Sequence, residues 1–266
     1  MDKLGLIAGG GGLPIALARY CMAAGRPLYV IRLEGFASPS LEAFEGETRS
    51  LFDFEGGFRA LHAAECHSVC FAGTVARPDL LADDAIGVPT EVVAARGADD
   101  SLLSTVTSHF QARGFRVEGA HEVMASLTLS EGPIGRVSPS AIDQPDIDRA
   151  MLVARAIGTL DVGQGAVCRD RLILAVEAQE GTDAMLKRVA DLFGSTTPKG
   201  VLVKASKPTQ DLCIDLPTIG PVTVELAAAA GLAGIAGEAG HVLIIDRDET
   251  IRLADELGLF IFGVTL

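Results

Sequence analysis

The sequence predicts an α/β protein of two domains, an N-terminal Rossmann-like layer plus a C-terminal mixed α/β domain. Short apolar segments of strand length alternate with longer segments of helical periodicity, which is typical of βαβ units. The 266 residues include 30 glycines and only 5% aromatic residues, as expected for many tight turns between packed elements. A stretch rich in proline and glycine interrupts the chain near its middle and predicts a domain connection.

The first half of the chain opens with a strand, a glycine turn, a helix and a second strand. Lys3–Ala8 is a short apolar run, and Pro14–Ala24 has helical spacing with a proline suited to a first helical turn. Leu28–Leu33 reads as the next strand, which favours a parallel sheet with a right-handed crossover. We assign residues 1–130 to this domain and expect further helices over Phe58–Glu65 and Leu102–Arg113, and strands over Ser68–Ala72 and Phe115–Val117.

Residues 131–145 predict a linker, and residues 146–266 a C-terminal α/β catalytic domain. The linker carries three prolines and two glycines within 15 residues. We expect helices over Asp146–Gly158, Asp183–Phe193, Val222–Ala230 and Asp248–Leu257. The expected strands are Gly165–Arg169, Leu172–Glu177, Gly200–Ser206, His241–Asp246 and Leu259–Val264.

Charge and cysteine content restrict the classes of function. A formal net charge of −13 opposes general nucleic-acid binding, because the phosphate backbone would be repelled, so we expect no nucleic-acid partner. Five cysteines at scattered positions do not form a disulfide pattern and favour a reducing compartment. We find no secretory signal and no apolar run long enough to span a bilayer. The sequence therefore predicts a cytoplasmic protein.

The glycine run after the first strand is a candidate phosphate or sugar cradle. Gly10, Gly11 and Gly12 let the backbone approach a ligand, and Leu13 opens a helix whose free N–H groups suit an anion. The spacing is neither G-x-G-x-x-G nor a P-loop. A purely structural turn is the alternative.

A second candidate follows the strand Ser68–Ala72. Thr74 and Arg77 lie where that strand ends, and ligands of open α/β sheets bind at the carboxyl ends of the strands. Thr74 offers a hydroxyl donor and Arg77 a guanidinium fork for phosphate. The alternative is a surface arginine before a proline turn.

The segment Glu177–Asp183 joins a strand to a helix and is rich in oxygen ligands. We expect its turn to bring the carboxylates of Glu177, Glu180 and Asp183 and the hydroxyl of Thr182 into one space, which suits Mg²⁺. Asp183 alone would otherwise cap the next helix.

A further polar segment follows the apolar run Val201–Val203. Lys207 can neutralise phosphate, and Asp211 or Asp215 can position or deprotonate a water molecule. A polar loop with unrelated surface charges is the alternative.

Taken together, these motifs resemble those of the LpxI-type UDP-2,3-diacylglucosamine pyrophosphatases of lipid A biosynthesis in Gram-negative bacteria. The most specific part is Glu-Gly-Thr-Asp-Ala-Met followed by Lys-Pro-Thr-Gln-Asp and Asp-Leu-Pro-Thr-Ile-Gly. The similar blocks span almost the whole chain: Ile7–Pro14, Ala72–Pro78, Leu160–Gln164, Glu177–Met185, Lys204–Gly220 and Ala230–Gly240.

The resemblance implies a Mg²⁺-dependent hydrolase with its substrate between two α/β domains. UDP-2,3-diacylglucosamine would be cleaved to UMP and 2,3-diacylglucosamine 1-phosphate (lipid X), with peripheral contact with the cytoplasmic face of the inner membrane. We expect Asp215, Asp211 and Asp183 to be catalytic, with Asp215 the strongest candidate. The expected metal ligands are Glu180, Asp183, Asp211 and Asp215. The expected substrate contacts are Gly10, Gly11, Gly12, Leu13, Thr74, Arg77, Gln164, Thr182, Lys207 and Gln210.

Two other functions fit the residues alone. An oxidoreductase that binds NAD(P) or FAD would use the same first strand and glycine turn, although the glycine spacing counts against it. A noncatalytic regulator would bind a UDP-sugar without turnover.

Overall fold

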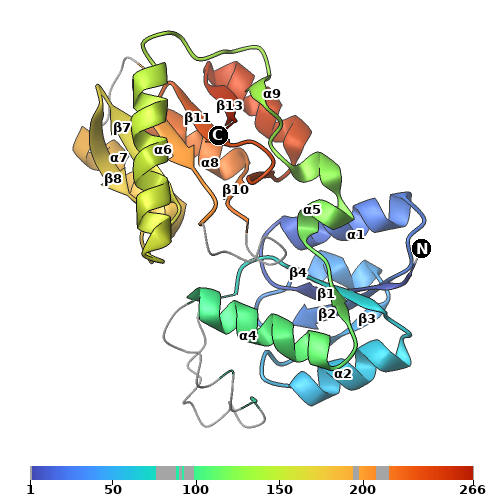
Figure 1. Cartoon of the computed structure of the whole chain (residues 1–266). Coiled ribbons are helices and arrows are strands. Elements are labelled where there is room, and N and C mark those ends of the chain that lie inside the picture. The colour runs from blue at the N-terminus through green and yellow to red at the C-terminus, as the bar shows by residue number, and fades with distance from the viewer. Residues whose placement is uncertain are drawn as a thin grey trace. The chain divides into compact units, whose positions relative to one another are not determined.

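The chain forms two compact units, Met1–Ser126 and Leu127–Leu266 (Figure 1). The computed structural model describes residues 2–75, 88–89, 92, 99–193, 198–207 and 216–265. Each unit contains its own sheet with helices on both faces, so the predicted fold class is confirmed.

The first unit is built on a five-stranded parallel sheet in the order β3-β2-β1-β4-β5. Its central strand is buried throughout, as expected for a parallel strand covered on both faces. The strands are β1 (Leu4–Ala8), β2 (Leu28–Leu33), β3 (Gly46–Arg49), β4 (Ser68–Ala72) and β5 (Arg116–Val117). The helices are α1 (Leu13–Ala23), η1 (Pro39–Ala43), α2 (Phe54–Ala63), α4 (Asp99–Ala112), α5 (Ala120–Val123) and, at the junction of the units, η2 (Ala125–Leu127).

Helices cover the two faces of this sheet unequally. Figure 1 shows α1 on one face and α2 with α4 on the other. Helices α2 and α4 meet through aromatic side chains, with the rings of Phe58 and Phe110 centred 4.7 Å apart. Apolar residues recur at helical spacing in α1 and α2 because one side of each helix packs against the sheet.

The second unit has a six-stranded mixed sheet in the order β6-β13-β11-β9-β7-β8. Strands β9, β11 and β13 are parallel to one another, whereas β7 runs antiparallel to both β9 and β8. The strands are β6 (Gly132–Ile134), β7 (Gly165–Arg169), β8 (Leu172–Val176), β9 (Val201–Lys204), β11 (Gly234–Glu238) and β13 (Phe260–Val264), with β10 (Thr218–Ile219) and β12 (Leu243–Ile244) paired separately. The helices are α6 (Gln144–Thr159), α7 (Gly181–Phe193), α8 (Pro221–Ala229) and α9 (Arg247–Leu257).

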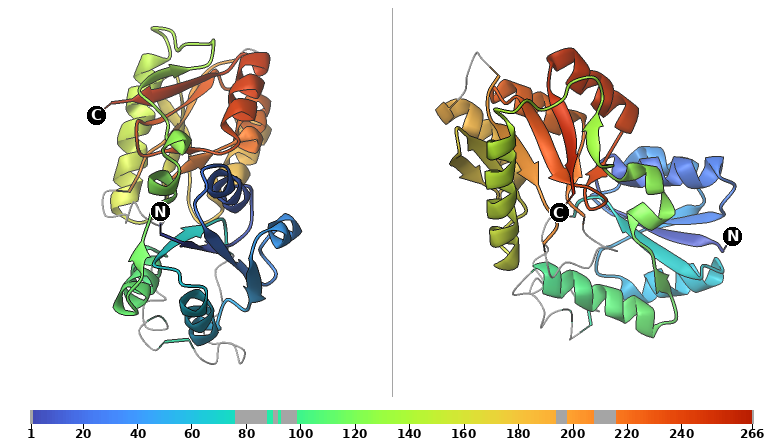
Figure 2. Two further views of the ribbon diagram at one scale, coloured as in Figure 1. Left: turned by 90° about the vertical axis from the view of Figure 1, so that its right-hand side faces the viewer. Right: turned by 45° about the horizontal axis from the view of Figure 1, so that its top comes forward.

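Two apolar cores lie on opposite faces of this second sheet. Figure 2 shows the sheet between α6 on one side and α8 and α9 on the other. Side chains alternate between the faces, so that Val201 and Val203 pack in the core under α6 and Leu202 packs in the core under α7, α8 and α9. This alternation also decides which residues at the strand ends face which helix.

Several elements differ from those that the sequence predicts. Strand β11 lies between β9 and β13 in the sheet but has no counterpart among the predicted strands. Residues 131–145, expected as a linker, contain β6, which pairs antiparallel with β13 inside the second unit. The expected strand His241–Asp246 is reduced to β12, and the edge strand β3 was not predicted.

Candidate functional site

The glycine turn of the first unit lies at the carboxyl ends of two adjacent strands. Gly10 N–H donates to the Thr74 carbonyl at 2.8 Å, and Thr74 N–H donates to the Gly10 carbonyl at 3.0 Å. Gly73 has φ +90°, and a Cβ there would lie 2.3 Å from the Gly10 oxygen. Only glycine fits at position 73, because any side chain there would collide with the Gly10 carbonyl group. This close contact holds Thr74 beside the turn.

This turn leaves backbone open beside the first helix. Gly11 has φ +85°, and nothing lies within 4 Å of the position of a Cβ. Gly12 is the N-cap residue of α1 and gives no side-chain cap, and Leu13 starts the helix. Gly10, Gly11, Gly12, Leu13 and Thr74, predicted as substrate contacts, are thus brought together at one edge of the first sheet, with geometry that suits an anionic group.

In the second unit, the carboxyl ends of four strands meet at one edge of the sheet. Strand β8 is antiparallel to β7, which is antiparallel to β9, so β8 ends at the same edge as β9, β11 and β13. The first polar residues at this edge are Glu177 after β8, Lys204 at the end of β9 and Glu238 at the end of β11. Ligands of α/β sheets bind at such an edge.

Glu177, Thr182 and Lys204 form a connected polar cluster at this edge. Lys204 Nζ donates to Thr182 Oγ1 at 2.7 Å, and Thr182 Oγ1 donates to Glu177 Oε1 at 2.9 Å. Lys204 Nζ also lies 3.5 Å from the Thr218 carbonyl oxygen and 3.8 Å from Glu177 Oε2. Glu177 is 7% exposed and Lys204 4% exposed, so both charges are withdrawn from water. Their opposite signs and the shared hydroxyl offset that cost.

Two buried oxygen atoms near this edge have no hydrogen-bond partner within the described part of the chain. They are Glu177 Oε2 and Gln164 Oε1. Gly163 and Gly165, which flank Gln164, leave the space that Glu177 occupies: a Cβ on Gly163 would lie 2.1 Å from the Glu177 carbonyl oxygen, and a Cβ on Gly165 would lie 2.4 Å from Oε2. Buried acceptors without a hydrogen bond are costly, and each one in a native structure calls for an explanation, of which a functional role is one.

Glu180 and Asp183 do not join this cluster. Arg188 Nη2 donates to Glu180 Oε1 at 2.6 Å, and a backbone hydrogen bond together with this arginine lowers the pKa of Glu180. Asp183 is exposed in the first turn of α7. The expected gathering of Glu177, Glu180 and Asp183 around Thr182 is thus found only for Glu177.

Lys207 lies on the face of the sheet that α6 covers. Its Nζ donates to Asp161 Oδ1 at 2.6 Å, and its backbone packs against Gly158 near the end of α6. Asp161 has φ 53°, an uncommon conformation for a residue other than glycine. Lys207, one of the expected phosphate contacts, is therefore only 9% exposed, and its ammonium group is bound by the Asp161 carboxylate.

A third group surrounds Glu238. Ser206 Oγ donates to Glu238 Oε2 at 2.9 Å, and His241 Nδ1 lies 3.2 Å from Oε1. Arg155 Nη1 lies 4.0 Å from the same oxygen. This group adds a second carboxylate to the edge, held by three separate elements.

The remaining expected site residues, Arg77, Gln210, Asp211 and Asp215, lie outside the described residues. Within the described ranges, no three histidine, cysteine or acidic side chains gather as a metal site would require. The four described cysteines, Cys21, Cys66, Cys70 and Cys168, are free and buried.

The sequence placed Glu177 in the carboxylate-rich turn before α7 but assigned no site role to Lys204, Asp161 or Glu238. One signal was present: Lys204 ends the apolar run Val201–Val203, and a lysine that ends a buried strand must find a partner. Asp161 and Glu238 carried no such signal, because their partners are 46 and 32 residues away.

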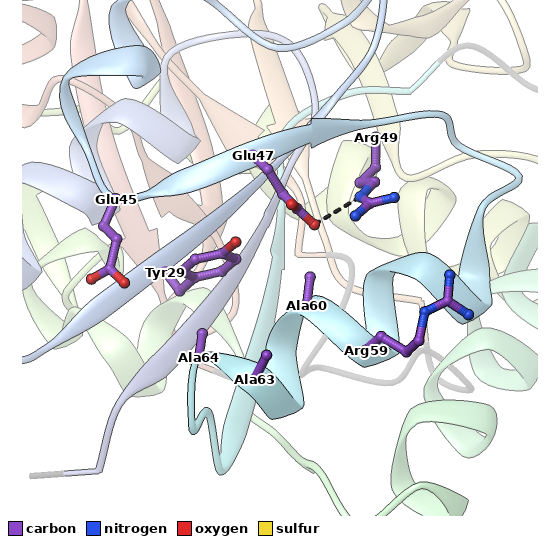
Figure 3. Close-up of a pocket in the computed structure, with 8 residues that line it drawn as sticks. All are labelled: Tyr29, Glu45, Glu47, Arg49, Arg59, Ala60, Ala63 and Ala64. Atoms are coloured by element: carbon purple, nitrogen blue, oxygen red, sulfur yellow. Dashed lines mark hydrogen bonds and ion pairs between the residues drawn. The ribbon is translucent and has the colours of Figure 1, made fainter.

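A shallow pocket of about 400 Å³ lies in the first unit, between β2, β3 and α2 (Figure 3). Tyr29, two alanines of α2 and Ala64, which follows that helix, form part of its lining, and the ion pair between Arg49 Nε and Glu47 Oε1, 2.7 Å long, lies at its side. None of the site residues expected from the sequence lines it. We therefore assign the candidate site to the sheet edges. Among the described residues, no helix is both long and apolar enough to cross a bilayer.

Known proteins match this chain over both units. The family model described as the LpxI N-terminal domain matches residues 3–127, and the one described as the LpxI C-terminal domain matches residues 130–262. A protein of Caulobacter vibrioides named UDP-2,3-diacylglucosamine pyrophosphatase LpxI is 54% identical over 274 residues. That alignment covers 99% of this chain and 98% of the relative.

Proposed function

The chain belongs to the LpxI family, and from this premise we propose that it hydrolyses the diphosphate of UDP-2,3-diacylglucosamine. The observation that carries the proposal is 54% identity across essentially the full length of both chains to a relative named for that activity. The products would be UMP and 2,3-diacylglucosamine 1-phosphate, lipid X, in lipid A biosynthesis. The reaction adds water to one phosphorus, breaks the bridging P–O bond and releases a proton.

The two sheet edges support this proposal in different ways. The open turn at Gly11 and the uncapped start of α1 suit a phosphate or nucleotide group. No side chain caps the backbone N–H groups there, so an anion could approach them directly. The second edge supplies Lys207 as a cation and Gln164 and Thr182 as polar contacts. We propose Gly10, Gly11, Gly12, Leu13, Thr74, Arg77, Gln164, Thr182, Lys207 and Gln210 as substrate contacts.

We also propose that the reaction depends on Mg²⁺, which supplies positive charge against the diphosphate and orients water. Of the proposed ligands, Asp183 is exposed and open to solvent, whereas Glu180 is already paired with Arg188. The described residues alone do not assemble a set of ligands. The proposal therefore depends on Asp183 together with Asp211 and Asp215, two oxygen donors of the kind that Mg²⁺ prefers. Asp215 is the proposed catalytic carboxylate, with Asp211 and Asp183 beside it.

The lipid nature of the substrate suggests where the protein works. A diacylated sugar nucleotide resides in or on a membrane, so we propose that this protein acts in the cytoplasm with peripheral contact with the inner membrane. The net charge of −13 would repel an anionic lipid surface, which favours brief contact over stable anchoring.

Release of UMP from UDP-2,3-diacylglucosamine tests the function directly. We expect purified protein to release UMP with Mg²⁺ present and to lose that activity in EDTA, with recovery when Mg²⁺ is restored. Titration calorimetry with Mg²⁺ alone gives a readout that does not depend on turnover. Substrate binding without UMP release would indicate a regulator and would overturn the proposal.

A further inference from the structure

The hydrogen bonds around Thr182 fix the direction in which its hydroxyl proton points. An ammonium group can only donate, so Lys204 Nζ must give the 2.7 Å hydrogen bond that Thr182 Oγ1 accepts. A carboxylate can only accept, so Thr182 must give its single hydroxyl proton to Glu177 Oε1, 2.9 Å away. The hydroxyl is left with one lone pair and no proton to offer.

From this arrangement we propose that Glu177 and Lys204 are positioning residues that make Thr182 a hydrogen-bond acceptor toward the substrate. The inference rests on the proposed function and deepens it. The partner of the hydroxyl would be a donor on the nucleotide sugar, such as a ribose or glucosamine hydroxyl group. A phosphate oxygen is excluded as its partner, because it is itself an acceptor.

The surroundings of the cluster support a role beyond packing. Thr182 belongs to the first turn of α7 at the sheet edge, whereas its two partners come from the ends of β8 and β9. Glu177 Oε2 stays without a hydrogen bond within the described residues, although Gly165 leaves room for it. A cluster selected for stability alone would satisfy that oxygen.

A pair of neutral substitutions separates positioning from stability. Glu177→Gln and Lys204→Met, each alone, leave one buried charge unpaired and should lower both the melting temperature and kcat/KM. The double variant Glu177→Gln/Lys204→Met removes both charges with little change in volume, so the melting temperature should recover. We expect kcat/KM to stay about tenfold or more below that of the unmodified protein, because the Lys204 donor is lost and the amide introduced at position 177 can donate as well as accept, so the direction of the Thr182 hydroxyl proton is no longer fixed.

Substitution of Thr182 gives an independent test that does not depend on the fate of the charge pair. Thr182→Ser keeps the hydroxyl and should retain most of kcat/KM, whereas Thr182→Val should lose about tenfold. The matched control is Thr250→Val in α9, because the Thr250 hydroxyl likewise donates a hydrogen bond, in its case to the Ile245 carbonyl at 2.6 Å. That variant should have a lower melting temperature. Its kcat/KM, measured at a temperature well below thermal unfolding, should stay close to that of the unmodified protein.

UDP-2,3-diacylglucosamine with Mg²⁺ is the assay substrate, and kcat and KM are measured separately for each variant. Recovery of kcat/KM in step with melting temperature in the double variant would show that the pair is only structural. Equal losses in Thr182→Ser and Thr182→Val, or a comparable loss in Thr250→Val, would also overturn the inference. No UMP release from the unmodified protein would overturn the proposed function itself, and the inference with it.

Discussion

Glu118 and Arg26 form a two-point ion pair in the first unit. Arg26 Nη1 donates to Glu118 Oε2 at 3.0 Å and Nη2 donates to Oε1 at 2.8 Å, with the glutamate side chain 7% exposed. Burial alone would raise the pKa of Glu118, but hydrogen bonds from Arg26, Ser68 and Arg116 outweigh it and lower the pKa to about 2. The carboxylate is therefore stabilised in its charged form.

This pair predicts a pH-dependent contribution to stability. Because the folded pKa lies below the ordinary value near 4.5, the contribution is complete above that pH and is lost as the pH falls toward 2. Glu118→Gln should lower the free energy of unfolding at pH 7 by about 2–3 kcal/mol, and by roughly half as much at pH 3. Urea unfolding followed by circular dichroism measures both. A deficit equal at the two pH values would contradict the assignment, and Glu55→Gln at the exposed pair with Arg113 serves as the control.

A buried aspartate should stabilise the turn between β7 and β8. Asp146 accepts hydrogen bonds from the N–H groups of Asp170 at 3.0 Å and Arg171 at 2.5 Å, and both turn residues have positive φ. Loss of these charged hydrogen bonds in Asp146→Ala should cost about 3 kcal/mol of unfolding free energy. Amide exchange at the two turn residues should accelerate. Asp148→Ala, an exposed site on the same helix, should leave both measurements nearly unchanged.

The two glycines beside Glu177 should respond differently to alanine. In Gly163→Ala the new Cβ meets the backbone of Glu177, which cannot move freely, so we expect a loss of about 1–3 kcal/mol in stability. In Gly165→Ala it meets the end of the Glu177 side chain, which can swing aside, so kcat/KM should fall more than stability does. Thermal melts and UMP release distinguish the two. Gly57→Ala, with no atom within 4 Å of the new Cβ, is the control.

Asp215 carries the strongest catalytic prediction made from the sequence. Asp215→Ala should reduce kcat by about a hundredfold or more, because loss of a general acid or base has effects of that size. We expect the melting temperature and much of the substrate affinity to remain. A near-normal rate of UMP release would remove Asp215 from the proposed mechanism. Asp191→Asn, at an exposed site on α7, is the charge control.

Local sequence patterns predicted the first sheet well. The expected strand Leu28–Leu33 has the bounds of β2, and Ser68–Ala72 has those of β4. These strands are short, mostly apolar runs between turn residues, as is typical of parallel strands covered on both faces. The glycine turn was predicted for the same reason, because a strand followed by bare backbone and a helix is a local pattern.

Strand β11 was missed because it contains two glycines, which are required by close packing against residues that are distant in the sequence. Its sequence, Gly-Ile-Ala-Gly-Glu, has low strand propensity. A Cβ on Gly234 would lie 2.4 Å from the Phe260 ring, and one on Gly237 would lie 2.8 Å from the Val242 side chain. A single sequence does not reveal such neighbours, so this interior strand was not predicted.

The sequence by itself determined the α/β class, the order of most strands and helices along the chain, and the family through motifs in a fixed order. Only the tertiary structure decided which polar groups meet, pairing Glu177 with Thr182 and Lys204 while Glu180 pairs with Arg188. The physical reason is that strand formation depends on neighbours in sequence, whereas a buried charge depends on partners brought close by the sheet. Lys204 is 22 residues from Thr182, and their contact exists only because β9 ends beside the start of α7.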